Sequence, residues 1–288
     1  MHMHINPVFR KELKLGVRSV RLPVIMLIYN SLLAFISLIV FYTILESAKW
    51  RGTVDYSAVL MLYAVMIAME GVLLAFIVPA MTSNAISGER ERQTLDILLT
   101  TRMTPFGIIT GKLMSSMSMV ILLIISSIPV MSIVFIFGGV TITDVLMIVL
   151  YLIFAAVFFG TIGIACSARF KKTTTSTVVS YGGVLGLCGG TLLIVIISAL
   201  ISMMQSAVRT KSIVGVVALI LLLNPGMTTF ALLMEQLANT SWISTLLHDG
   251  FGIPLIFSDH WIPISIVMQL CIMLLLLWRA MANLKAKK

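Results

Sequence analysis

Six long apolar runs divide this sequence, and each is long enough to cross the hydrocarbon core of a lipid bilayer. Crossing about 30 Å of hydrocarbon as an α-helix takes about 20 residues. Because a backbone exposed to lipid must satisfy its own hydrogen bonds, each run is expected to be a transmembrane helix. The predicted spans cover residues 22–45, 56–81, 108–137, 145–168, 178–204 and 262–278.

The composition excludes the alternatives to a membrane protein. Hydrophobic residues make up 59 % of the 288 residues and charged residues only 11 %, whereas a soluble domain carries about 25 % charged residues. An ordinary soluble enzyme, a disordered chain and a disulfide-rich secreted domain are therefore excluded. We expect an all-α membrane protein that forms a single transmembrane domain over residues 1–288.

The basic residues gather on one side of this arrangement. With six spans, 16 of the 20 Lys and Arg residues lie in the N-terminal segment, the connections after the second and fourth spans, and the C-terminal tail. The other four are Lys49, Arg51, Arg209 and Lys211. The positive-inside rule then predicts that both termini are cytoplasmic. The net charge of +9 thus reflects topology, and nucleic acid is not expected as a partner.

The external region, residues 205–261, contains an apolar run that is too short to span. Residues 213–223 give only eleven positions before Asn224-Pro225-Gly226 interrupts them, which is typical of a re-entrant or interfacial segment. We expect a short external re-entrant helical hairpin here. If this run joined residues 227–237 as a seventh span, the C-terminus would be external, against the charge distribution.

No enzyme or metal motif is apparent in the sequence. The segment from Gly107 to Leu113 contains Gly-Lys but is one residue short of a phosphate-binding loop, and it lacks the Ser or Thr that would hold magnesium. The four histidines show no ligand spacing, and the three cysteines lie inside apolar runs. We therefore expect no catalysis, no bound ATP and no metal site on this chain.

The N-terminal residues 5–21 are predicted to form an interfacial amphipathic helix. Asn6 can cap it and Pro7 suits its first turn. An apolar stripe runs beside a basic one, an arrangement typical of a helix lying in a membrane interface; these stripes contain Phe9, Leu13 and Val17, and Arg10, Lys14 and Arg18. The simpler alternative is a segment that only sets topology.

The connection after the second span, residues 83–105, is the most informative part of the chain. A charged run is followed by leucines that a short helix would place on one side, so the segment could dock on a soluble partner through an apolar contact ringed by charges. A solvated loop is equally compatible with these residues. The candidate docking residues are Glu89, Arg90, Glu91, Arg92, Thr94, Leu95, Asp96, Leu98 and Leu99.

This segment resembles a motif of the permease subunits of type-2 ABC exporters (ABC-2). Those permeases carry a sequence close to E-x-x-x-G-T-L-E-x-L-L-x-T-P-x-S-P between spans two and three, followed by Gly-Lys at the next span. The matching residues here are Glu89, Thr94, Leu95, Asp96, Leu98, Leu99, Thr101, Thr104, Pro105, Gly111 and Lys112. Two positions depart from the pattern, since Gln93 replaces a usual Gly and Arg102 a usual Pro. They predict a helix that runs longer and ends differently.

The resemblance implies an ATP-driven exporter permease in the plasma (inner) membrane of a bacterial cell. Two copies, or this chain and a homologous permease, would form the pathway, and separate ABC ATPase subunits would bind ATP and magnesium. The segment from Glu89 to Leu99 would be the coupling helix that contacts an ATPase. Gly182, Gly186 and Gly190 place small residues on one face of the fifth span, so this face is expected either at a dimer contact or in packing within one subunit.

Glu70 is the only carboxylate in the middle of a predicted span, where a charge is costly. It is expected to face a polar interior or to pair with a nearby Ser or Thr. It also supports a rival function, a secondary transporter driven by an ion gradient with Glu70 as the ion carrier. A second rival is a membrane anchor or sensor that transports nothing.

Overall fold

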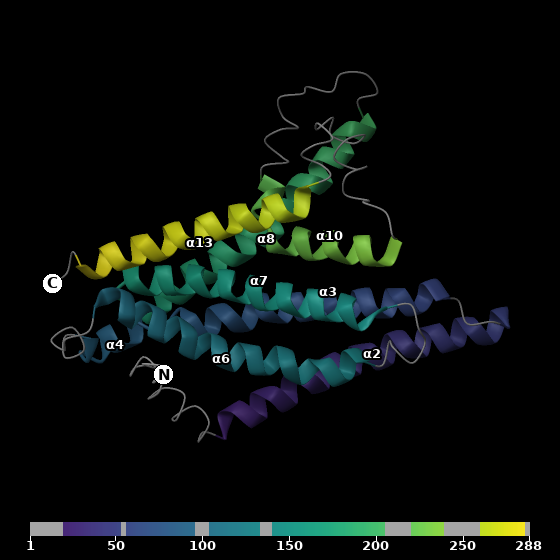
Figure 1. Ribbon diagram of the computed structural model, residues 1–288, viewed down its shortest axis with the longest axis horizontal. Helices are drawn as coiled ribbons and strands as arrows, with labels where there is room; N and C mark the ends of the chain where they lie inside the picture. Colours follow the sequence, from purple (N-terminus) through teal and green to yellow (C-terminus); the bar gives the residue numbers. More distant parts are fainter. Residues whose placement is uncertain are drawn as a thin grey trace.

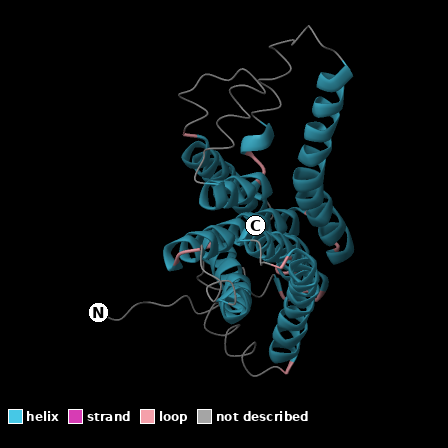
Figure 2. Ribbon diagram, turned by 90° about the vertical axis from the view of Figure 1, so that its right-hand side faces the viewer, coloured by secondary structure: helices cyan, strands magenta, loops and turns pink. Residues whose placement is uncertain are grey.

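The computed structural model describes residues 20–52, 56–95, 104–132, 140–204, 220–238 and 260–285, and within these ranges every regular element is an α-helix (Figure 2). Most of the long helices run roughly side by side, whereas the helix of residues 173–204 rises steeply away from them, and a short helix lies at one end of the bundle (Figure 1). The helices are α2 (Arg21–Arg51), α3 (Tyr56–Thr82), α4 (Ser87–Glu91), α6 (Pro105–Met131), α7 (Ile142–Arg169), α8 (Thr173–Met204), α10 (Pro225–Ala238) and α13 (Trp261–Lys285).

Six of these helices, α2, α3, α6, α7, α8 and α13, are long and apolar enough to cross a membrane. The six predicted spans are thereby confirmed as helices, although several of their ends differ. The first helix continues past residue 45 to Arg51, where an exposed Glu46–Lys49 pair at 2.8 Å supports another turn. Gly52 then ends it with a left-handed φ of 75°.

Two helix starts follow directly from local sequence. Thr104 caps α6 by accepting a hydrogen bond from the Gly107 amide, and Pro105 occupies the first turn. Thr141 and Asp144 form a capping box at the start of α7. The described part of α6 ends at Met131, whereas the third apolar run extends to residue 137, in a part of the chain outside the described residues.

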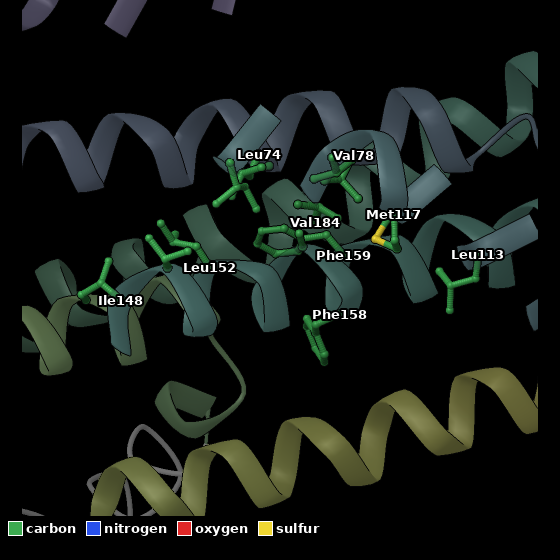
Figure 3. Packing of buried hydrophobic residues seen from close by; sticks show 14 of the residues in the cluster. Leu74, Val78, Leu113, Met117, Ile148, Leu152, Phe158, Phe159 and Val184 are labelled. Carbon is green, nitrogen blue, oxygen red and sulfur yellow. The ribbon is translucent and has the colours of Figure 1, made fainter. Parts of the chain in front are cut away.

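The central element of the bundle is α7. In its most apolar stretch 61 % of residues are buried, against 17 % in the corresponding stretches of α2, α8 and α13. Side chains of α7, among them Ile148, Leu152 and Phe159, lie between α3 and the neighbouring helices (Figure 3). The outer helices expose large apolar side chains instead, as expected of surfaces that meet lipid acyl chains.

A close approach of three helices depends on Gly163 of α7. A Cβ atom at this position would lie 1.9 Å from Thr82 Oγ1 and 2.9 Å from Thr82 Cβ of α3, and 3.4 Å from Ser180 Oγ of α8. Thr82 and Ser180 are completely buried, so neither side chain can turn away into open space. The end of α3 and the start of α8 therefore meet α7 at a contact that admits only glycine.

The break predicted at Asn224-Pro225-Gly226 is present. A turn at Leu223 precedes Asn224, and α10 begins at Pro225, so residues 220–238 do not form one continuous helix. Asn224 Oδ1 accepts a hydrogen bond from the Gly226 amide at 2.8 Å, an Asx turn that caps the new helix. The seventh-span alternative is not supported by this break.

Helix α10 is about 21 Å long, and it lies alongside α7 and α13 (Figure 1). Its first residue accepts a hydrogen bond from Tyr151 of α7 at 3.3 Å, and Gln236 near its other end donates one to the Asp144 carbonyl at 3.0 Å. Because Asp144 and Tyr151 are about 10 Å apart along α7, α10 follows only part of the length of that helix.

Two predicted regions lie wholly or largely outside the described residues. The interfacial helix at residues 5–21, with Phe9, Arg10, Leu13, Lys14, Val17 and Arg18, is one of them. Of the external region 205–261, only residues 220–238 and 260–261 are described.

Replacing Gly163 with alanine should destabilise the protein by about 1–3 kcal/mol, because the added methyl overpacks a site bounded by buried side chains. Thermal unfolding of the purified protein in nanodiscs measures the change. Gly71→Ala on α3 is the matched control, since a Cβ there meets no atom within 4 Å. Equal unfolding midpoints for the two variants would contradict the close approach at Gly163.

Candidate functional site

The turn between α3 and α4 buries Ser83, Ile86 and Ser87 while Asn84 is exposed, and side-chain hydroxyls satisfy its buried backbone groups. Ser167 Oγ of α7 accepts hydrogen bonds from the amides of Ile86 and Ser87, both at 2.9 Å. Ser176 of α8 donates to the Ser83 carbonyl at 2.6 Å, and Ser83 and Thr177 share a hydroxyl contact at 2.9 Å. The chain can thus leave the helical conformation inside the bundle without leaving these backbone groups unpaired.

Helix α4 is attached to the start of α6 by an ion pair. Lys112 Nζ lies 2.7 Å from Glu89 Oε1, and the two side chains are 5 % and 26 % exposed. A lysine buried to this extent requires an anionic partner close by. The two ends of the ABC-2-like motif, 23 residues apart, therefore meet in space.

Two further charged residues of α4 bind the connection between α7 and α8. Arg90 donates to the carbonyls of Phe170 at 2.7 Å and Ala168 at 3.2 Å, so it satisfies the end of α7, where carbonyls lack helical partners. Glu91 accepts hydrogen bonds from the amide and the hydroxyl of Thr173, both at 2.8 Å. A carboxylate at that position also complements the positive N-terminal end of α8.

These contacts change the interpretation of the charged run. We expected Glu89, Arg90 and Glu91 to ring a contact with a partner, but each binds another helix of this chain. Within the described residues from Ser87 to Leu95, the exposed positions are 91–94, whereas Leu95 is 5 % exposed and packs in the main apolar core. Leu95 therefore stabilises this chain and is not available as an apolar contact for a partner.

The expected lengthening of the helix at Gln93 is wrong. Helix α4 ends at Glu91, and Gln93 has a left-handed φ of 58°. This conformation is easy for glycine and costs about 1 kcal/mol for other residues, so the position has the geometry of the glycine that the motif usually carries. The glutamine changes the energy of the turn and leaves its shape intact.

The remaining motif residues are only partly described. Thr104 and Pro105 form the start of α6 described above, and Thr94 donates to the Glu89 carbonyl at 3.2 Å. Asp96, Leu98, Leu99, Thr101 and Arg102 lie outside the described residues.

The glycine face of α8 has no close neighbour among the described residues. A Cβ atom at Gly182, Gly186 or Gly190 would have no described atom within 4 Å. Both expectations for this face, a dimer contact and packing within one subunit, stay predictions. Large apolar side chains on the same helix, including Leu185 and Leu193, are exposed as well.

Glu70 lies in a polar cluster between α2, α3 and α6. It is completely buried, and its Oε1 atom accepts hydrogen bonds from Tyr29 at 3.1 Å and Ser127 at 2.8 Å. Asn30 and Ser126, which neighbour Tyr29 and Ser127 in the sequence, form another contact between α2 and α6, with Asn30 donating at 2.9 Å. The expected pairing with a serine is present, and a tyrosine that the sequence did not indicate joins it.

Sequence reasoning missed most of the hydroxyl groups that hold α4 in place. Ser83, Ser87, Ser167, Ser176 and Thr177 carry no charge and belong to no motif. The available signal was the density of Ser and Thr in residues 82–87 and 173–180, at the end of the second apolar run and the start of the fifth. Such residues satisfy backbone groups where helices break or end.

Comparisons with known proteins add no family to this description: no protein-family model matches the chain, and no curated protein matches it significantly. The likeness to ABC-2 permeases consequently depends on the motif residues and on the layout of the spans.

Replacing Lys112 with methionine should destabilise the protein by about 1–3 kcal/mol, because Glu89 would remain half-buried without its cation. The double variant Lys112→Met with Glu89→Gln should recover part of this loss, since it leaves no uncompensated charge. Thermal unfolding of the single and double variants measures both effects. Additive losses in the double variant would show that the two residues do not stabilise each other.

Proposed function

We propose that this chain is the transmembrane permease subunit of an ATP-driven ABC exporter. ATP and magnesium would bind to separate ATPase subunits, and the exposed surface around α4 would contact one of them. The chain would lie in the plasma membrane of a bacterial cell with both termini in the cytoplasm, and export would proceed away from the α4 end.

The observation that carries this proposal is the attachment of α4 to three spans at once. Glu89 binds α6, Arg90 the end of α7, and Glu91 the start of α8. A push on the exposed residues 91–94 would reach all three helices through charged contacts that are short and directional. A connection that served only to link α3 and α6 would not require this set of contacts.

The proposed partner within the membrane is a second permease, either a copy of this chain or a homologue. Its support is the open glycine face of α8, where another backbone could approach closely. In the proposed exporter, α10 would belong to the external region, residues 205–261, at the end of the bundle away from α4.

A secondary transporter is the competing candidate, and the complete burial of Glu70 favours it. The two functions differ in their energy source. Export that stops on ATP depletion supports the ABC permease. The secondary transporter is supported if export survives ATP depletion, stops when the proton gradient is removed, and is absent in the Glu70→Gln variant.

The sharpest test of the proposed coupling changes the exposed residues of the α4 segment. Arg92→Glu combined with Thr94→Glu should weaken binding of the ATPase at least about tenfold and lower the stimulated ATP hydrolysis accordingly, because both side chains are exposed. Co-purification of the tagged chain from membranes and ATPase assays of the purified complex measure the two effects.

The control for this experiment is Lys49→Glu, a charge reversal on an exposed side chain near the end of α2, at the opposite end of the bundle. It should leave association and hydrolysis unchanged. Leu95→Glu is a poor probe because Leu95 is buried in the core of this chain. Equal binding of the ATPase to the Arg92/Thr94 variant and to the wild type would contradict the proposal that the α4 segment contacts the ATPase.

Bulky residues on the glycine face should weaken association between permeases. Gly186→Leu with Gly190→Leu is expected to shift dimers to monomers by at least about tenfold in dissociation constant, while the fold persists because both positions face open space. Single-molecule photobleaching in bilayers counts the copies. Gly71→Leu, also at an open position but on α3, is the matched control, and dimers that survive only the control change support the contact on α8.

A further inference from the structure

Glu70, which is completely buried, has one oxygen atom that nothing in the described part of the chain satisfies. Its Oε2 atom has essentially no accessible surface and no hydrogen-bond partner there. Asn30 Oδ1, on the α2 residue that contacts Ser126 of α6, is a second buried acceptor without a partner in the described residues. An unsatisfied buried carboxylate oxygen is costly, which indicates that Glu70 has a further partner, a donor or a cation.

The groups that surround Glu70 leave its negative charge without a counter-charge. Tyr29 faces it from α2 and Ser127 from α6, and both contribute neutral hydroxyls to the same atom, Oε1. Apolar side chains, Leu33 of α2 and Leu123 of α6, complete the packing beside Tyr29. Among the described residues, Tyr29 is the titratable side chain that contacts Glu70 from these two helices, and no ion pair to Glu70 is present there.

The charged residues of the same three helices are too far along them to neutralise Glu70. On α6 the nearest is Lys112, about 22 Å of helix rise from Ser127, and it already pairs with Glu89. On α2 the charged residues are Arg21, at the beginning of the helix, and Glu46, Lys49 and Arg51, in its last two turns. On α3 Glu70 is alone. A counter-charge for Glu70 must therefore come from outside the side chains described.

We propose that the Glu70 cluster binds one small monovalent cation, a proton or Na⁺, between α2, α3 and α6. The carboxylate supplies the charge, and the neighbouring hydroxyl oxygens of Tyr29 and Ser127 supply the neutral oxygen ligands that hard cations prefer. A bound cation would satisfy the Oε2 atom of Glu70 and would stabilise the contact of α2 with α3 and α6. This site goes beyond the proposed export function and does not depend on an ATPase.

The purified chain in nanodiscs, without any ATPase, suffices to test the site. Replacing choline by Na⁺ should raise the unfolding midpoint of the wild type by at least about 2 °C and should lead to binding of about one ²²Na⁺ per chain. Glu70→Gln, which keeps the shape but removes the charge, should abolish both effects. Glu46→Gln is the matched control, because it makes the same chemical change on the exposed end of α2, and it should behave as the wild type.

The proton is distinguished from Na⁺ in the same samples. If the cation is a proton, no ²²Na⁺ binds, and the wild type takes up about one proton more per chain than Glu70→Gln as the pH falls from about 8 to about 5, with a rise in its unfolding midpoint that the variant lacks.

Ser127→Ala keeps the carboxylate but removes one ligand, and it covers the case in which Glu70→Gln does not fold. It should raise the cation concentration needed for half of the effect by about tenfold. Wild-type protein that shows neither a Na⁺ effect nor proton uptake beyond that of the variants overturns the proposal, whatever the outcome of the ATPase experiments.

Discussion

The arrangement of this protein depends on one constraint, the satisfaction of a broken backbone inside an apolar bundle. Helix α3 ends at Thr82, and Ser83, Ile86 and Ser87 of the following turn are buried. Unpaired amides and carbonyls there would each cost several kcal/mol. Hydroxyls from α7 and α8 remove this cost, and in doing so they determine where α4 lies relative to both helices.

The charged contacts of α4 extend this arrangement to the rest of the bundle. With its position set by the hydroxyl groups, α4 can direct Glu89 to Lys112 and Arg90 to the end of α7. Helices α6, α7 and α8 are thereby joined at one end. Helix α2 instead contacts α3 and α6 through Tyr29 and Asn30, beside an apolar contact that includes Leu33 and Leu123. Within the described residues, ionic and hydroxyl contacts thus join the helices at the α4 end, whereas α2 is held by a mixed polar and apolar contact.

Hydropathy predicted the six spans because each run of about 20 apolar residues has no stable alternative to a helix. Hydropathy could not predict the pairing of Glu89 with Lys112. Both residues were recognised from the motif, but their contact depends on the shape of the turn between α3 and α4. The motif also mispredicted the helix end near Gln93, because a side chain that disfavours a left-handed φ is overruled there by the surrounding contacts. The sequence also could not show that a Cβ at Gly186 has no described atom within 4 Å. The spacing of small residues is the same whether or not another helix packs on that face. Serine and threonine gave no clear signal because they occur both in lipid-facing helices and at breaks.

The pairing of Glu89 with Lys112 has a consequence for how chains of this kind can vary. The two residues hold the ends of the intervening segment together, and the entropy cost of closing a loop rises only slowly with its length. Lengthening the connection between Leu95 and Thr104 by a few residues would thus cost little free energy of loop closure. The Glu89–Lys112 pair would still hold α4 beside the start of α6.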